Sequence, residues 1–222
     1  MDVQDLREMN WIGAALWADG EQSSQRAFEA MAAVVSLGTP EERVIERAGM
    51  ALLERVHREG GWTQGEALQN PFFRIETSGR FLLVALHRCR WSYHRCSRIL
   101  AVSEEQVAER AWAARVQLSG QWIAGHSPMG AGRHCPEFHA RRPWVQAFLD
   151  DELSVRTRLY LQNHMMACDA CRGLLHQARR IFQATEEALP EEVVPSQEAY
   201  EQWSQWLKRS SIGLQWNRRS SF

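Results

Sequence analysis

Three residues in the C-terminal half of the chain have the types and the spacing of metal ligands. They lie in the run His-Met-Met-Ala-Cys-Asp-Ala-Cys, and they are His164, Cys168 and Cys171. Imidazole and thiolate are ligands that zinc prefers, and two cysteines separated by two residues can bind one tetrahedral ion. On a helix, spacings of four and three place side chains on one face. The run therefore predicts a zinc site whose fourth ligand comes from another part of the chain.

Two upstream residues are candidates for that fourth ligand. Cys135 and His139 both have suitable side chains, and they share a face if one helix contains both of them. Four protein ligands leave no open coordination position for a substrate or an activated water, so we expect a structural ion.

The surrounding segment, residues 135–185, resembles the zinc-binding anti-sigma domain of bacterial transcription regulators. It has that family's amphipathic helix, a Leu-Asp-Asp-Glu-Leu turn and a second helix that ends in the ligand run, although Asp151 stands where the family usually has glycine. The resemblance implies Zn²⁺ as the cofactor. It also favours His139 as the fourth ligand, because His139 precedes His164 by 25 residues, as the first histidine does in that family. Cys135 remains the alternative ligand.

Upstream of this module, residues 78–118 predict a helix-turn-helix. An apolar helix at 80–86 is followed by a helical segment at 91–100, a short Ala-Val-Ser turn and a last helix that begins at 104. Ser103 and its neighbour three residues later fit a capping box, which marks the start of a helix. The segment resembles the fourth region of extracytoplasmic-function sigma factors, which in that family reads a promoter element.

This second resemblance implies DNA contacts from five side chains, namely Arg95, Arg98, Gln106, Arg110 and Arg115. The last helix, however, departs from the family pattern. Positions that are usually basic hold alanine or tryptophan, and Glu104, Glu105 and Glu109 add negative charge. Because DNA binding gains affinity when Lys and Arg neutralise phosphates, these carboxylates disfavour direct promoter reading. The alternative is a protein-interaction module that does not bind DNA.

The elements together predict an all-α fold. We expect a helical sigma-like region at 1–118, a glycine-rich linker at 119–134, a zinc-binding anti-sigma domain at 135–189, and a tail at 190–222 that contains an amphipathic helix.

The composition of the 222 residues narrows the class of protein. A hydrophobic content of 45% is enough for packed cores, and a net charge of −1 excludes a strongly basic nucleic-acid binder overall. Five cysteines, most of them at or beside the expected metal site, fit a reducing compartment better than a disulfide framework. The sequence contains neither a signal peptide nor an apolar run near the roughly 18–20 residues of a membrane span. We therefore expect a soluble, cytoplasmic protein without a membrane anchor.

These features predict a bacterial transcription regulator. A sigma-like region is fused to a zinc-binding anti-sigma module that controls this region, a partner sigma factor or RNA polymerase, with promoter DNA as a further partner. Tethering in one chain raises the effective concentration of the module, so we expect it to dock intramolecularly. Cys168 and Cys171 are oxidisable and Cys135 could act as a resolving thiol, which gives the hypothesis of a redox response. A purely structural zinc is the alternative.

The sequence does not predict an enzyme. It contains no recognisable nucleophile–base pair, phosphate-binding glycine loop or catalytic pair of carboxylates. A thiol–disulfide oxidoreductase that uses Cys168 and Cys171 is disfavoured, because that chemistry usually accompanies a βαβ pattern and the sequence has no runs typical of strands.

Overall fold

The computed structural model describes residues 3–17, 20–37, 39–59, 71–119, 135, 138–189, 201 and 205. Every regular element in these ranges is a helix, which confirms the predicted all-α fold class. None of these described helices is long and apolar enough to cross a lipid bilayer. The predicted linker and the predicted amphipathic helix of the tail lie outside the described residues, apart from Ser119, Glu201 and Gln205.

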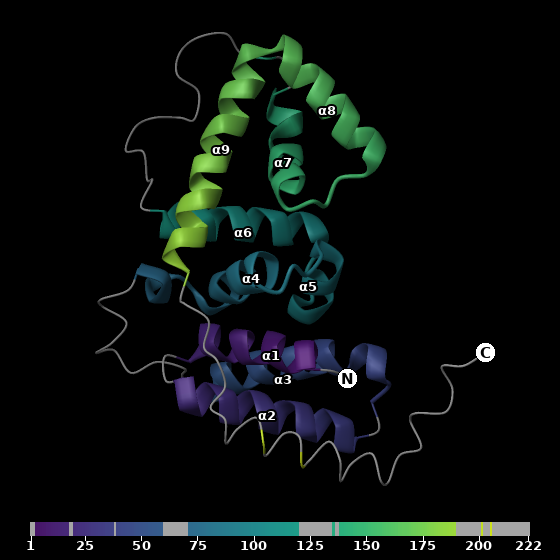
Figure 1. Ribbon diagram of the computed structural model, residues 1–222, viewed down its shortest axis with the longest axis vertical. Helices are drawn as coiled ribbons and strands as arrows, with labels where there is room; N and C mark the ends of the chain where they lie inside the picture. Colours follow the sequence, from purple (N-terminus) through teal and green to yellow (C-terminus); the bar gives the residue numbers. More distant parts are fainter. Residues whose placement is uncertain are drawn as a thin grey trace, which may run out of the picture. The chain divides into compact units, whose positions relative to one another are not determined.

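The chain forms two compact units. The helices described within residues 3–59 belong to one unit, and those described within residues 71–189 belong to the other (Figure 1). The second unit combines the helices within residues 71–118 with the helices that carry the metal ligands.

The first unit contains three helices that all contact one another: α1 (Val3–Leu16), α2 (Gly20–Ser36) and α3 (Glu41–Glu59). Their apolar faces form a core that includes Met9, Ile12, Leu16, Met31 and Leu52. Gly13 lets α1 and α2 approach closely, because a Cβ atom there would lie 2.7 Å from the backbone oxygen of Ser23.

The second unit begins with the short 3₁₀ helix η1 (Pro71–Arg74), followed by α4 (Thr77–His87), α5 (Tyr93–Leu100) and α6 (Glu104–Leu118). α4 is buried from Gly79 to His87, since its sequence is apolar nearly all round and α6 packs on it. The helix predicted at 80–86 is thus confirmed.

The junction between α5 and α6 has the chemistry that the sequence predicts. Ala101 adopts a left-handed backbone with φ 54°, and the Val102 N–H donates to the Ser97 carbonyl at 3.1 Å, which ends α5. Ser103 then forms the expected capping box with Gln106, so that each side chain accepts a hydrogen bond from the other residue's backbone N–H.

Three further helices complete the second unit: α7 (Phe138–Leu149), α8 (Val155–Ala167) and α9 (Asp169–Ala188). α9 packs against both α7 and α8, and α6 packs against α7 and α9 (Figure 1). α6 therefore packs directly against helices of the segment that contains the predicted zinc ligands.

The turn between α7 and α8 explains why a glycine is usual at position 151 in the family that this segment resembles. Asp151 has a left-handed backbone with φ 63°. This conformation lets the Glu152 N–H donate to the Ala147 carbonyl at 2.8 Å, which satisfies one of the last carbonyls of α7. Glycine adopts positive φ without strain, and aspartate tolerates it better than most other residues do.

We expect position 151 to respond to backbone strain rather than to charge. The free energy of unfolding of Asp151→Gly should lie within about 0.5 kcal/mol of the parent value. Asp151→Val should lower the free energy of unfolding by about 1–2 kcal/mol, because a β-branched residue is strained at positive φ. Urea unfolding of the zinc-loaded chain measures both effects. Gln162→Val, on the exposed face of α8, is the control for introducing valine. A fully stable Asp151→Val variant would contradict this account of the turn.

Candidate metal centre

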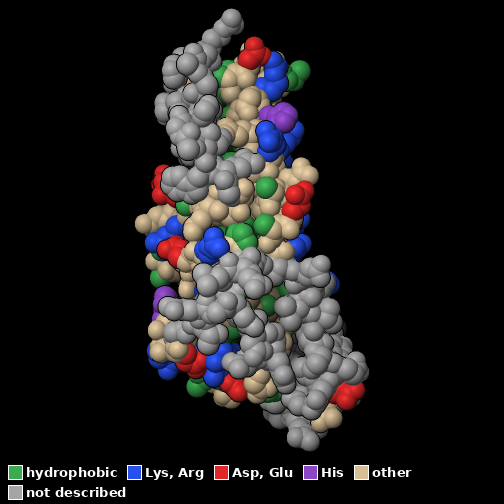
Figure 2. Space-filling view, turned by 90° about the vertical axis from the view of Figure 1, so that its left-hand side faces the viewer, with side chains coloured by type: hydrophobic (Ala, Val, Ile, Leu, Met, Phe, Trp, Pro, Cys, Tyr) green, Lys and Arg blue, Asp and Glu red, His purple; other side chains and the backbone are tan. Residues whose placement is uncertain are grey.

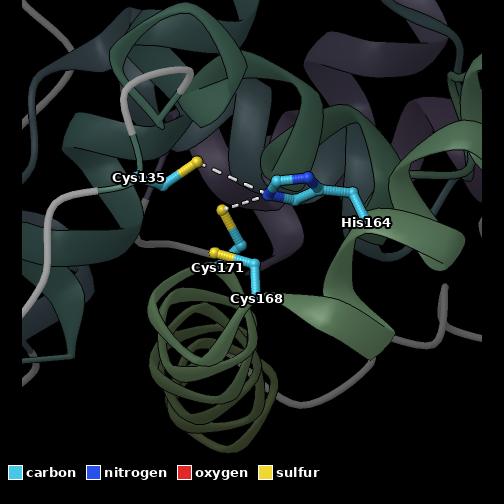
Figure 3. A group of neighbouring side chains, drawn as sticks. All are labelled: Cys135, His164, Cys168 and Cys171. Carbon is cyan, nitrogen blue, oxygen red and sulfur yellow. Dashed lines mark hydrogen bonds between the residues drawn. The ribbon is translucent and has the colours of Figure 1, made fainter.

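Four potential ligands converge in the second unit: Cys135, His164, Cys168 and Cys171 (Figure 3). Their ligand atoms all lie within 4.8 Å of one another. The Nε2 atom of His164 is 3.5 Å from the Sγ atom of Cys135 and 3.2 Å from the Sγ atom of Cys171. Bond lengths to zinc of about 2.0–2.3 Å place the ligand atoms of a tetrahedral site roughly 3.5–3.8 Å apart. The cluster thus has the composition and nearly the dimensions of a Cys₃His zinc site.

Three separate segments bring these side chains together. Cys135 precedes α7, His164 lies in the last turn of α8, and Cys171 lies in the first turn of α9. Cys168 separates α8 from α9, with an extended backbone at φ −118° and ψ 106°. The expectation that one helix presents His164, Cys168 and Cys171 on a single face is therefore wrong. The chain changes direction at Cys168, and this break lets the side chains surround a point.

The surroundings of the cysteines suit a metal ion. Burial raises the pKa of the Cys171 thiol to about 12, whereas the backbone N–H of Cys171 holds the pKa of the Cys168 thiol below its usual value. A buried thiolate requires compensating positive charge, which bound Zn²⁺ supplies. The donor set therefore fits zinc, and with four protein ligands the ion would be structural.

Apolar residues close the site from the protein side. Cys135 and Cys171 belong to a buried cluster whose other members come from α7, α8 and α9: Val145, Leu161, Met165, Leu174, Leu175 and Ala178. Trp112 of α6 packs against the same cluster. The metal centre and the contact with α6 therefore share one hydrophobic core.

The fourth ligand predicted from the family spacing was His139, with Cys135 as the alternative. Among the described side chains, Cys135 completes the cluster. The backbone of His139 lies in the first turn of α7, but its side chain is outside the described residues, so its role stays a prediction.

Four of the five residues predicted to contact DNA lie at or near the surface of α5 and α6. Arg98 and Arg110 are exposed, Gln106 is exposed but takes part in the capping box, and the Arg95 guanidinium lies 4.6 Å from the ring centre of Trp91. Figure 2 faces the left-hand side of Figure 1, away from α5; among the described residues visible there, basic and acidic side chains are interspersed.

The fifth residue, Arg115, points inward. Its side chain is 1% exposed, and its Nη1 atom donates to the Asp150 carboxylate at 2.9 Å while Nη2 pairs with the other carboxylate oxygen. Its Nε atom donates to Nε2 of His87 at 2.9 Å. Because it is buried, Arg115 is not accessible to a DNA phosphate. Instead, its contact with Asp150 joins the α7–α8 turn to α6.

His87 extends this network to α9. Since the Arg115 Nε–H is a donor, Nε2 of His87 must accept, and the ring proton therefore lies on Nδ1, which is 2.8 Å from the Glu186 carboxylate. The imidazole also packs on the ring of Phe182, with 4.3 Å between the ring centres. Burial is the main reason that the pKa of His87 lies below its usual value.

Sequence reasoning missed His87, Asp150 and Glu186 as a connected set. A histidine and an arginine within otherwise apolar helical faces are weak signals, because the sequence does not show that the two contact each other or that each faces a distant carboxylate. The sequence placed Asp150 in the family-like turn, but it did not predict that Asp150 pairs with Arg115.

Comparison with known proteins supports the assignment of the zinc module. Residues 140–172 match the family model described as "Putative zinc-finger". The match covers most of α7, the whole of α8 and the start of α9, including His164, Cys168 and Cys171. Searches of curated proteins and of solved structures found no match. The segment is thus similar to a putative zinc-finger family, and three of its residues join Cys135 in a Cys/His cluster that fits zinc.

Metal analysis of single variants tests the fourth ligand. A complete four-ligand site holds about one zinc ion per chain. We expect the zinc-to-protein ratio of Cys135→Ala to be well below this value, because one ligand is lost. His139→Ala and the control His176→Ala, an exposed histidine on α9, should retain the ion. Zinc loss in His139→Ala together with zinc retention in Cys135→Ala would instead establish the ligand favoured by the family spacing.

The neutral, buried His87 predicts a specific pH dependence. Its pKa in the folded state lies below its ordinary value, so the unfolded state binds the proton more readily. The stability that depends on neutral His87 is present above about pH 6.5 and is lost as the pH falls below this value, at no more than about 1.4 kcal/mol per pH unit.

Urea unfolding at pH 7.5, 6.5 and 5.5 measures this effect against His87→Gln, which cannot titrate. The difference in the free energy of unfolding between the parent and His87→Gln should shrink as the pH falls. His176→Gln, at an exposed histidine of α9, should follow the parent at every pH. A difference that is constant with pH would show that His87 does not titrate as its burial requires.

Proposed function

We propose that this chain regulates bacterial transcription, with a sigma-like helix-turn-helix formed by α5 and α6 and a zinc module that controls it from within the same chain. The packing of α6 against α7 and α9, which carry or adjoin the metal ligands, supports this proposal. The match of residues 140–172 to a zinc-finger family supports the anti-sigma character of the module.

The zinc ion would act on this arrangement through geometry. Cys168 and Cys171 hold the start of α9 next to the end of α8, and the distal part of α9 carries Phe182 and Glu186, which contact His87 of α4. Loss of the ion would free the start of α9 and weaken contacts further along the same helix. The zinc would thus be structural, and we propose that the chain is not an enzyme, because four protein ligands leave no open coordination position.

A redox response would use the same site. A peroxide would oxidise Cys168, Cys171 or Cys135 to a sulfenic acid and so remove a thiolate ligand. The three sulfur atoms lie close enough for a neighbouring thiol to attack the sulfenic acid, which forms a disulfide and releases water. We propose this as the signal that the module could sense, with inert structural zinc as the alternative.

The described surface of α6 allows DNA contact on one side. Arg110 and Gln106 are exposed there, together with Arg98 of α5, and the zinc module occupies the opposite side, toward which Arg115 points. The carboxylates at the start of α6 oppose phosphate binding, so promoter DNA is the least supported of the proposed partners, after a sigma factor and RNA polymerase.

An exposed apolar stripe on α8 favours the second candidate function, a protein-interaction module that does not bind DNA. Val155, Leu159 and Met166 lie on one helical face and are 75%, 54% and 79% exposed. Exposed apolar stripes of this kind are typical of surfaces that bind another protein.

Gel-shift assays on fragments of bacterial genomic DNA, with and without core RNA polymerase, separate the two functions. If α5 and α6 bind DNA, the double variant Arg98→Ala/Arg110→Ala should weaken binding. It should also make the slope of log K against log salt concentration shallower by about one for each phosphate that is no longer neutralised. Arg179→Ala/Arg180→Ala, at two exposed arginines of α9, is the matched control and should bind as the parent does.

The absence of any DNA shift, combined with co-purification of a sigma factor or polymerase, would replace the first proposal by the second. In that case Leu159→Glu should abolish the co-purification, while Arg156→Glu, at an exposed residue on another face of α8, should preserve it.

A further inference from the structure

Three consecutive carboxylates in the α7–α8 turn have different partners. Asp151 is exposed and pairs with Arg158 of α8, within the zinc module itself. Asp150 and Glu152, on either side of it, both contact the α5–α6 pair. The left-handed backbone of Asp151 makes this division, because it turns the chain between the two flanking residues.

Asp150 binds both helices of the pair. It accepts two hydrogen bonds from Arg115 near the end of α6 and one from the Tyr93 hydroxyl at the start of α5. The side chains of Arg115 and Asp150 are 1% and 3% exposed. A buried charge is tolerated only when a partner of opposite charge and further hydrogen bonds compensate it, so each of these two residues depends on the other.

Glu152 binds the N-terminus of α5. It accepts the Tyr93 N–H at 3.0 Å, and Tyr93 is the first residue of that helix. Ser92 already accepts the Arg95 N–H, so the two side chains satisfy different free N–H groups of the first turn. A carboxylate at this end is also favoured by the helix dipole.

Together these contacts require particular groups on the partner. The turn needs an arginine on the face of α6 that points toward the module, a hydroxyl on the first residue of α5, and a free N–H at the same place. A helix pair without the arginine would leave Asp150 buried and unpaired, which disfavours that partner more strongly than a missing apolar side chain would.

We propose that the α7–α8 turn is the recognition element by which the zinc module selects its helix pair, and that the partner it fits is the α5–α6 pair of this same chain. This inference rests on the proposed function in treating the module as a regulator of that pair. The module therefore acts in cis, and Asp150 and Arg115 are its main specificity determinants.

Cleavage of the folded, zinc-loaded chain tests the proposal. Protease sites introduced within residues 120–134 and 190–200 allow the intact protein to be cut after folding, so that the module is retained by its contacts alone. Association of the module with the remainder is then measured by analytical ultracentrifugation over a dilution series, with no DNA or polymerase present.

We expect Asp150→Asn and Arg115→Met each to weaken this association by at least about 30-fold, because each leaves a buried group without its charged partner. The double variant should lose less than the product of the two single losses, since the residues interact directly. Asp151→Asn, which removes the neighbouring exposed carboxylate, should change the association by less than about twofold.

Arg115→Met separates recognition from folding of the module, because Arg115 lies outside the zinc-binding segment. Weakened association with full zinc content in this variant supports the proposal even if Asp150→Asn loses zinc. Parent-like association of Arg115→Met, or equal losses for Asp150→Asn and Asp151→Asn, would overturn it. Because the readout is association alone, a chain that fails the DNA and polymerase assays can still pass this test.

Discussion

Ligand atoms from three segments must meet within a few ångströms, and the rest of the second unit follows from this requirement. His164 lies in the last turn of α8 and Cys171 in the first turn of α9, so a continuous helix between them would present both on one face instead of around a point. The extended backbone at Cys168 breaks the helix and gives α9 its own direction. That direction brings the distal part of α9 to His87. The metal site therefore decides which surface of α9 meets the α4–α6 helices.

A second constraint acts where the zinc module meets α6. Arg115 carries a permanent positive charge in a place that water scarcely reaches, so its contacts must satisfy the whole guanidinium. Asp150 neutralises it and accepts from Nη1 and Nη2, and His87 accepts from Nε, so each of the three nitrogens has a partner. These two partners come from opposite sides of Arg115 along the chain. A change that moves the turn or α9 must therefore also disturb the environment of Arg115, which links the docked position of the module to a small number of buried groups.

Local chemistry was predictable wherever it depends on neighbouring residues. The capping box of Ser103 and Gln106 and the apolar helix before it are confirmed, because caps and helical periodicity are set within a few positions of the sequence. The prediction of one helix from His164 to Cys171 was wrong, because spacing alone does not show where a metal site interrupts hydrogen bonding. Arg115 was predicted as a DNA contact, and its inward orientation depends on a carboxylate 35 positions away.

The sequence by itself determined the all-α class and the identity of the ligand run, since both follow from residue types and short spacings. The resemblance to a known family marked position 151 as unusual, although only the backbone shows that this residue is left-handed. The tertiary structure alone decided that Cys135 lies with His164, Cys168 and Cys171, and that Arg115 faces Asp150 rather than solvent. The physical reason is that metal coordination and charge burial are satisfied in space, by groups that packing brings together from distant parts of the chain.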